Sequence, residues 1–156
     1  MHDLDDSRAA VKCDLAAAVI RSSGELRLKV TGSSMLPSIW PGDILTIRRQ
    51  NLDQIRPGEI VLVARDGGLC AHRVLANSGP LLTTRGDALR CADPPVPFDQ
   101  VLGRVTSILR GRTRISPRPS LNIRHRLLSS LLRRSSTLTI LLLRLHALRR
   151  QPWAAV

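Results

Sequence analysis

The chain has 156 residues, enough for one modest domain with short appendages. Its 24 Lys and Arg residues outnumber its 12 Asp and Glu residues, and only three residues are aromatic, so Leu, Val and Ile must fill the core. Three cysteines without a Cys-x-x-Cys pair argue against a disulfide framework and a zinc site, and the four histidines lack metal-ligand spacing. We therefore expect no metal and no cofactor, and for Cys70 and Cys91, which lie close to the candidate site residues, we favour small core residues over a metal or redox role.

The charge is distributed unevenly along the chain. Residues 1–99 carry twelve basic and twelve acidic residues, so this part is neutral. Residues 100–156 carry twelve arginines and no acidic residue, which accounts for the net charge of +12. The sequence thus predicts a charge-balanced domain followed by a basic tail.

The chain begins with a predicted helix in residues 1–24. An Asp-Asp-Ser cap at residues 5–7 precedes an amphipathic pattern over residues 7–22, with Val11, Leu15 and Val19 on one face. Gly24 ends the helix. We expect the Val11 face to pack on the core.

The middle of the chain, residues 25–110, reads as a β domain. Residues 25–31 alternate strictly between polar and apolar, as in a half-buried strand. Gly- and Pro-containing turn signals separate the later apolar runs. This spacing predicts a mainly β fold, a small coiled antiparallel sheet or barrel. The other expected strands span 44–48, 59–64, 69–76, 81–85 and 101–109.

The end of the chain reads as a linker and a helical tail. Residues 111–120 are too rich in Pro, Arg and Ser to pack, so we expect a linker there. Within residues 121–156 we expect one long or two short helices, with Leu127, Leu128, Leu131 and Leu132 on one face. The apolar run at 138–145 is too short to span a membrane.

Two roles for residues 121–150 stay open. Their arginines and leucines suit a helix lying on an anionic membrane surface. A helical hairpin packed on the β domain or on another subunit fits almost equally well. Specific nucleic-acid binding is less attractive, because the tail offers no aromatic residues between its charges to stack on bases.

A serine motif follows the first expected strand. In residues 31–47, Gly32 and Ser33 lead to Ser34-Met35, and a Pro-Gly-Asp turn follows. The segment resembles the nucleophile box of the type I signal peptidases and their relatives, the S24/S26 serine endopeptidases. The resemblance implies that Ser34 is the nucleophile and that Met35 meets the substrate. The alternative is an ordinary Ser/Gly/Pro loop between strands.

A histidine motif lies about forty residues further on. A serine hydroxyl needs a neighbouring base to become a nucleophile, and the chain has no lysine after Lys29 to serve as one. His72-Arg73-Val74 is similar to an element of the family's histidine-bearing branch, which includes endoplasmic-reticulum, archaeal and SipW-like enzymes. The resemblance implies that His72 is the base, supported by Arg73. The alternative is a structural histidine in a strand.

Two aspartates complete the resemblance. Gly86-Asp87 and Asp93 fall where the histidine branch carries a Gly-Asp pair and a further aspartate. An aspartate of this kind holds the second imidazole nitrogen and stabilises the imidazolium. The resemblance assigns that role to Asp93 and a supporting role to Asp87, although the two could be reversed. Each could instead be a turn residue that bonds its own backbone.

The resemblance, which covers about residues 25–110, implies a serine endopeptidase that cleaves signal or leader peptides through an acyl-enzyme. It also implies an extended polypeptide substrate along a strand edge and small residues beside the cut. Oxyanion stabilisation would come from backbone amides near Ser34, with help from Ser33.

Some features depart from the family pattern. Ala88-Leu89-Arg90 stands where asparagines are common, and about thirty residues without a membrane-spanning run precede Ser34. We therefore expect a peripheral membrane or cytoplasmic protein. One alternative is a cytoplasmic relative that processes a leader peptide or itself, but not a LexA-like repressor, since a DNA-binding helix pair is missing. The other is a non-enzymatic β domain tethered to a membrane or partner.

Overall fold

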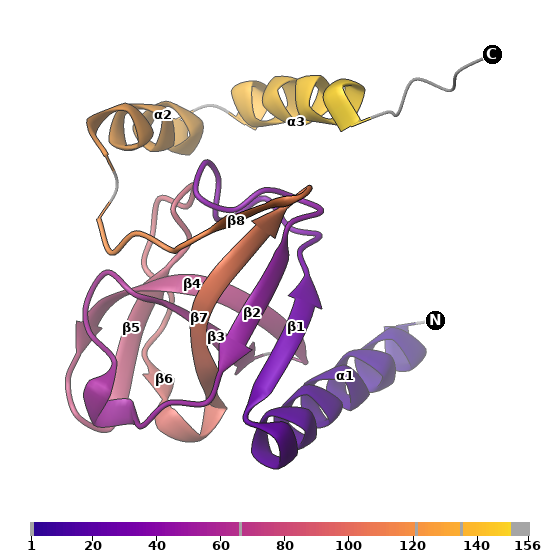
Figure 1. Ribbon diagram of the computed structural model, residues 1–156, viewed down its shortest axis with the longest axis vertical. Helices are drawn as coiled ribbons and strands as arrows, with labels where there is room; N and C mark the ends of the chain where they lie inside the picture. The colour runs from indigo at the N-terminus through magenta and orange to yellow at the C-terminus, as the bar shows by residue number, and fades with distance from the viewer. Residues whose placement is uncertain (1, 66, 121, 135, 151–156) are drawn as a thin grey trace.

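The computed structural model describes residues 2–65, 67–120, 122–134 and 136–150 (Figure 1). In this part of the chain, eight strands form one sheet. Helix α1 (His2–Ser23) lies beside the first strand, and helices α2 (Ile123–Arg134) and α3 (Ser136–Arg150) lie across one end of the sheet. The strands are β1 (Glu25–Lys29), β2 (Ile44–Arg48), β3 (Ile60–Arg65), β4 (Gly68–Asn77), β5 (Leu81–Arg85), β6 (Val96–Pro97), β7 (Val101–Arg110) and β8 (Thr113–Ile115).

The sheet is antiparallel and open. Its strands follow the order β1-β2-β7-β3-β4-β5-β6, and β8 pairs with β7. Each pairing is antiparallel. The mainly β prediction is confirmed, as an open coiled sheet and not as a closed barrel. The six strands expected from the sequence are present with small shifts at their ends, whereas β6 and β8, two and three residues long, were not predicted.

Strand β3 explains how the core is built. Its side chains alternate between two clusters of buried aliphatic residues: Ile60 and Leu62 belong to one cluster, Val61 and Val63 to the other. Successive strand side chains point to opposite faces, so β3 is covered on both of its faces. Each face of a central strand therefore needs apolar residues, which is why its sequence is a continuous apolar run.

Helix α1 packs through a different face from the one predicted. It begins at His2, before the expected start at residue 7. Ala16 and Ile20 are buried, whereas Val11 and Leu15 are more than half exposed. The prediction that Val11 and Leu15 form the packing face was wrong. The helix carries apolar residues on more than one face, and the sequence pattern alone does not show which face meets the sheet.

The expected linker is partly ordered by contacts with the sheet. Residues 113–115 form β8, which pairs with the end of β7. Gly58 adopts a φ of +94°, and a Cβ atom there would lie 2.3 Å from the carbonyl oxygen of Pro119. This glycine therefore lets the segment after β8 lie directly on the β domain. The expectation that residues 111–120 do not pack was wrong.

The tail forms two helices whose faces differ in exposure. In α2, Ser129 and Leu132 are buried, whereas Leu127 and Leu131 are exposed. The four leucines expected on one face therefore differ in burial: Leu132 packs on the β domain, whereas Leu127 and Leu131 face away from it. Figure 1 shows both helices above the loop that joins β1 to β2.

Two further expectations bear on the surface. Cys70 and Cys91 are exposed, so the prediction that they are small core residues was wrong, and Cys13 is half-buried. In the described ranges these thiols form no disulfide. None of the helices described has the length and apolar character needed to cross a membrane.

Candidate active site

Ser34 lies in the loop between β1 and β2, and this loop is closed at its base. The Val30 amide donates a hydrogen bond to the Asp43 carbonyl oxygen at 2.8 Å. The fully buried Asp43 carboxylate accepts hydrogen bonds from the Trp40 backbone amide at 2.8 Å and from Arg110 Nη2 at 2.7 Å. The carboxylate thus ties the loop to strand β7, and the serine is held on a fixed support.

Met35 has a different role from the one expected. It is 3% exposed and packs in the main aliphatic cluster with Ile39 and Leu45. The interpretation that Met35 meets the substrate is therefore wrong. Its side chain anchors the loop, and because Ser34 directly precedes it, the serine remains partly accessible at the surface.

The structure brings Ser34, His72 and Asp93 together in one line of hydrogen bonds. His72 Nε2 lies 3.0 Å from Ser34 Oγ, and His72 Nδ1 lies 2.7 Å from Asp93 Oδ2. The side chains of His72 and Asp93 are 9% and 15% exposed. Each ring nitrogen has one partner, so a neutral imidazole that donates from Nδ1 to the carboxylate leaves Nε2 to accept from the hydroxyl.

Thr84 is a site residue that sequence reasoning missed. Its hydroxyl donates to Asp93 Oδ2 at 2.6 Å, and its carbonyl oxygen accepts from the Asp93 backbone amide at 2.8 Å. Thr84 lies on β5 and is 1% exposed. These two bonds fix the loop that carries Asp93. A threonine in a strand has no distinguishing sequence signal, so only the fold could reveal it.

Asp87 lies in a neighbouring cluster and does not contact His72 in the described hydrogen bonds. Its two carboxylate oxygens accept from Arg73 Nε and Nη2, both at 2.8 Å, and one also accepts from the Ser38 hydroxyl. Asp87 is 3% exposed and Arg73 is 8% exposed. This buried bidentate pair joins β4, beside His72, to the loop after β5, and the Ser38 hydroxyl ties the Ser34 loop to the same carboxylate. The structure therefore places Asp93 on the His72 ring and Asp87 on the Arg73 guanidinium.

The backbone of Ser34 is held by the loop after β5. The Ala88 amide donates to the Ser34 carbonyl oxygen at 2.8 Å. A Cβ atom at Gly86 would lie 2.6 Å from that same oxygen, which is closer than any ordinary contact. Gly86 is therefore required for the close approach of the two loops.

The tail helices form one wall of the cleft beside Ser34. Arg90 donates to the carbonyl oxygens of Arg133 and Arg134 at the end of α2, and Arg133 Nε donates to the Asp87 carbonyl oxygen at 3.0 Å. Burial lowers the pKa of Arg133, nearby Arg85 lowers it further, and Asp87 raises it. The other cleft residues are Gly32, Ser33, Ser34, Ala88, Leu89, Leu132, Thr139, Ile140 and Leu143.

Helix α3 contacts the loop between β1 and β2, which carries Ser34. The His146 and Trp40 rings lie with their centroids 4.6 Å apart, and His146 Nε2 lies 3.3 Å from the Pro41 carbonyl oxygen. Packing on the β domain, one of the two expected roles of the tail, is thus present. Sequence reasoning missed these contacts because they join residues more than one hundred positions apart.

Two backbone groups at the serine remain available as donors. Among the described residues, the Ser34 and Met35 amides donate to no protein atom, although the next amide, that of Leu36, donates to the Ser33 carbonyl oxygen at 3.2 Å. Backbone amides that have no protein acceptor and lie beside a nucleophile are the kind of donor that can stabilise a developing oxyanion. The Ser33 side chain is half-buried and lines the same cleft. Within the described ranges, no group of three or more His, Cys, Asp or Glu residues could hold a metal ion.

A serine, a histidine and an aspartate in hydrogen-bond contact are the arrangement of a serine hydrolase. The family model described as Peptidase S24-like matches residues 3–82, about half of the chain. The chain belongs to this peptidase S24-like family. The match includes Ser34 and His72, and it ends before Asp87 and Asp93. No curated protein matches the sequence.

Proposed function

We propose that this protein is a serine endopeptidase that cleaves signal or leader peptides through a Ser34-His72-Asp93 mechanism. The observation that carries the proposal is the continuous pair of hydrogen bonds from Ser34 Oγ through the imidazole to Asp93. Membership of the S24-like family supports the serine peptidase class. The distances of 3.0 Å from His72 Nε2 to Ser34 Oγ and 2.7 Å from His72 Nδ1 to Asp93 Oδ2 lie within the hydrogen-bond reach that proton transfer requires, which supports the proposal.

The mechanism follows from the two ring nitrogens of His72. Nε2 accepts the Ser34 hydroxyl proton as Oγ attacks the scissile carbonyl carbon. Asp93 stabilises the imidazolium that forms. Nε2 then protonates the leaving amine, the C–N bond breaks, and an ester to Ser34 remains. A water molecule, deprotonated by the same nitrogen, attacks the ester, and the proton returns to Oγ as the acid product leaves.

The oxyanion has candidate donors in the Ser34 loop. The amides of Ser34 and Met35 are the groups we assign to this role, with the Ser33 hydroxyl as a third donor. One such donor typically contributes about 3 kcal/mol to transition-state stabilisation. Because the buried Met35 side chain and the Ala88 hydrogen bond fix this backbone, the donors need little reorganisation during the reaction.

The substrate path is supported by the pairing of β4. Strand β5 pairs with β4 only from Arg73 onward, whereas Ala71 and His72 pair with β3 on the other side. An extended peptide can therefore add beside β4 next to His72 through backbone hydrogen bonds. A hollow of about 330 Å³ adjoins His72 and Asp93 there and offers room for substrate side chains.

We further infer that the enzyme resembles the histidine branch of the signal peptidases. The supporting features are the His-Arg-Val element, the absence of lysine after Lys29, and the Asp87-Arg73 pair that joins the two motifs. A cytoplasmic relative that processes a leader peptide or itself is the second candidate. A non-enzymatic tethered domain is less well supported, because it gives no reason for the hydrogen-bonded contact of Ser34, His72 and Asp93.

We also propose that the outer side of α2 and α3 contacts an anionic membrane surface. Large apolar side chains are exposed on these helices although their other faces pack on the β domain. Residues 100–156 contain arginine and no acidic residue, which favours anionic lipid. The exposed apolar residues that do not line the Ser34 cleft are Leu127, Leu131, Leu138, Leu141 and Leu145.

A cleavage assay tests the proposed function. The full chain and the variants Ser34→Ala, His72→Ala and Ser78→Ala would be incubated with preprotein and leader-peptide mixtures, and new termini mapped by mass spectrometry. Wild type and Ser78→Ala, which removes an exposed turn hydroxyl, should give the same new termini, and the other two variants should give none. Identical termini from all four proteins would contradict the proposed endopeptidase activity.

Cleavage of preproteins after small residues would favour the hypothesis that the protein is a signal peptidase. Cleavage confined to a leader peptide or to the chain itself would favour the cytoplasmic relative.

A further inference from the structure

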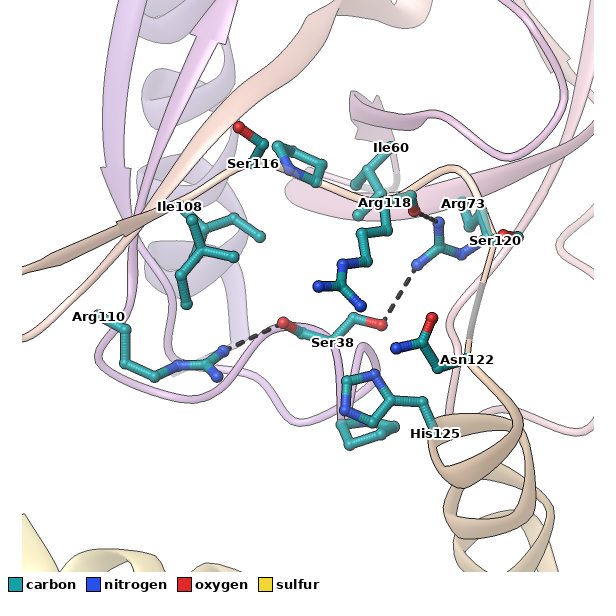
Figure 2. Close-up of a pocket in the computed structure, with 13 residues that line it drawn as sticks. Ser38, Ile60, Arg73, Ile108, Arg110, Ser116, Arg118, Ser120, Asn122 and His125 are labelled. Atoms are coloured by element: carbon teal, nitrogen blue, oxygen red, sulfur yellow. Dashed lines mark hydrogen bonds between the residues drawn. The ribbon is translucent and has the colours of Figure 1, made fainter.

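A second cavity, separate from Ser34, lies between the end of the sheet, the segment after β8 and the beginning of α2 (Figure 2). Its volume is about 320 Å³. In Figure 2 the Arg118 side chain extends into this space toward Ser38, and Asn122 and His125 lie on the side where α2 begins. The cavity thus gathers polar donors from segments that are far apart in the sequence.

The charge of this cavity is positive. Arg73 and Arg110 are each neutralised by a buried carboxylate, Asp87 and Asp43 respectively. Arg118 forms no ion pair within the described ranges, and no acidic residue is among those that line the cavity. One full positive charge therefore faces the space without a counter-ion from the protein.

The remaining groups indicate what ligand fits. Donors approach from different directions: the Arg118 guanidinium, the Asn122 amide and the His125 ring, together with the Ser120 hydroxyl. Donors arranged in several directions suit a tetrahedral anion. A planar carboxylate needs only the two parallel hydrogen bonds of one guanidinium group. The apolar part of the wall consists of Pro37, Ile60, Ile108, Ile115 and Pro117, and Ser38, Ser116 and the paired arginines Arg73 and Arg110 complete it.

We propose that this cavity binds a phosphate group attached to a partly apolar molecule. Arg118 supplies the charge, Asn122 and His125 supply directional hydrogen bonds, and the isoleucines contact the apolar part. A lipid headgroup and a soluble phosphate ester share this chemistry. The site does not depend on peptidase activity, because Ser34, His72 and Asp93 do not line it.

The test is calorimetric titration of the full chain at constant ionic strength. The ligands would be inorganic phosphate, glycerol 3-phosphate, dihexanoyl phosphatidate below its micelle concentration, and acetate. The variants would be Arg118→Gln, Asn122→Ala and, as a control of equal charge, Arg112→Gln. Arg112 is exposed in the turn between β7 and β8 and does not line the cavity.

Phosphate compounds should bind to wild type and to Arg112→Gln with the same affinity. Affinity should fall at least tenfold in Arg118→Gln and should also fall in Asn122→Ala. Tighter binding of phosphatidate than of glycerol 3-phosphate would identify a lipid source, and the reverse order a soluble ester. Equal losses in Arg118→Gln and Arg112→Gln, acetate binding as tight as phosphate binding, or no binding of any phosphate compound would overturn the proposal.

Discussion

At the residue scale, we expect Asp93 to affect catalysis and Asp87 to affect stability, and substitution should distinguish these two roles. Asp93→Asn removes the group that orients and stabilises the imidazole, so kcat should fall by about 10³- to 10⁴-fold. Asp87→Asn leaves the buried Arg73 charge without its counter-ion, which should cost about 3–5 kcal/mol of folding free energy. Peptide-cleavage kinetics and urea unfolding measure the two effects.

The decisive result is which variant loses kcat and which variant loses stability. Asp93→Asn should unfold at nearly the same urea concentration as wild type, because its side chain forms no arginine pair in the described residues. If Asp87→Asn had the larger defect in kcat at unchanged stability, the assignment of the two aspartates would be reversed.

Gly86 offers a second test at this scale. Gly86→Ala places a carbon against the Ser34 carbonyl oxygen, so the serine loop must shift. A displacement of about 1 Å at a nucleophile can cost roughly 10²-fold, so we expect a decrease in kcat/KM of that order. Gly32→Ala lies on the same loop, but its added carbon meets no atom within 4 Å, so its melting temperature should equal that of wild type. An unchanged kcat/KM in Gly86→Ala would contradict the close approach.

At the residue scale, sequence motifs located side chains that the fold brings together, while their catalytic roles stay a prediction. Ser34, His72 and Asp93 stand in short recognisable patterns, and the structure brings them into contact. Thr84 and Ser38 also bond the key carboxylates, yet each is a common polar residue without a pattern of its own. Met35 was misjudged because a sequence motif does not show which side of the loop faces the core.

At the scale of elements, helices α2 and α3 form part of the wall of the Ser34 cleft. Arg90 holds the end of α2 through two carbonyl oxygens, where a cation is favoured by the helix dipole. Arg90→Gln should loosen α2 and lower kcat/KM for a soluble peptide several-fold, with little change in melting temperature. Arg27→Gln, an exposed arginine on β1, provides the control of equal charge.

Kinetics with a soluble peptide in the absence of lipid make this comparison decisive. If Arg90→Gln and Arg27→Gln had the same kcat/KM as wild type, the tail would not shape the cleft.

Elements were predicted well where period and turn signals agreed. Strands β2 and β5 match their expected bounds, because a Pro-Gly-Asp turn precedes β2 and Gly-Pro and Gly-Asp pairs flank β5. The failures arose from tertiary contacts. Strand β8 forms in a Pro- and Arg-rich segment because β7 offers it a free edge, and α1 buries Ala16 and Ile20 because that face meets the sheet.

At the scale of the whole molecule, the exposed leucines of α2 and α3 should direct the protein to anionic lipid. Leu131→Ser combined with Leu141→Ser should weaken flotation with vesicles that contain phosphatidylglycerol. Val11→Ser combined with Leu15→Ser removes similarly exposed apolar groups from α1 and should leave flotation unchanged. High salt should reduce flotation, since arginine attraction to the headgroups is screened. Equal flotation with pure phosphatidylcholine vesicles would contradict the role of charge.

The central claim is that the Ser34 hydroxyl and the His72 imidazole act as one catalytic unit. The most direct measurement is kcat/KM for Ser34→Ala, His72→Ala and the double variant on one cleaved peptide. Each single change should cost at least about 10³-fold, and the double variant should be no slower than the slower single variant, because the second change removes a group that no longer has a function. Losses that multiply in the double variant, or a His72→Ala enzyme as fast as wild type, would contradict the claim.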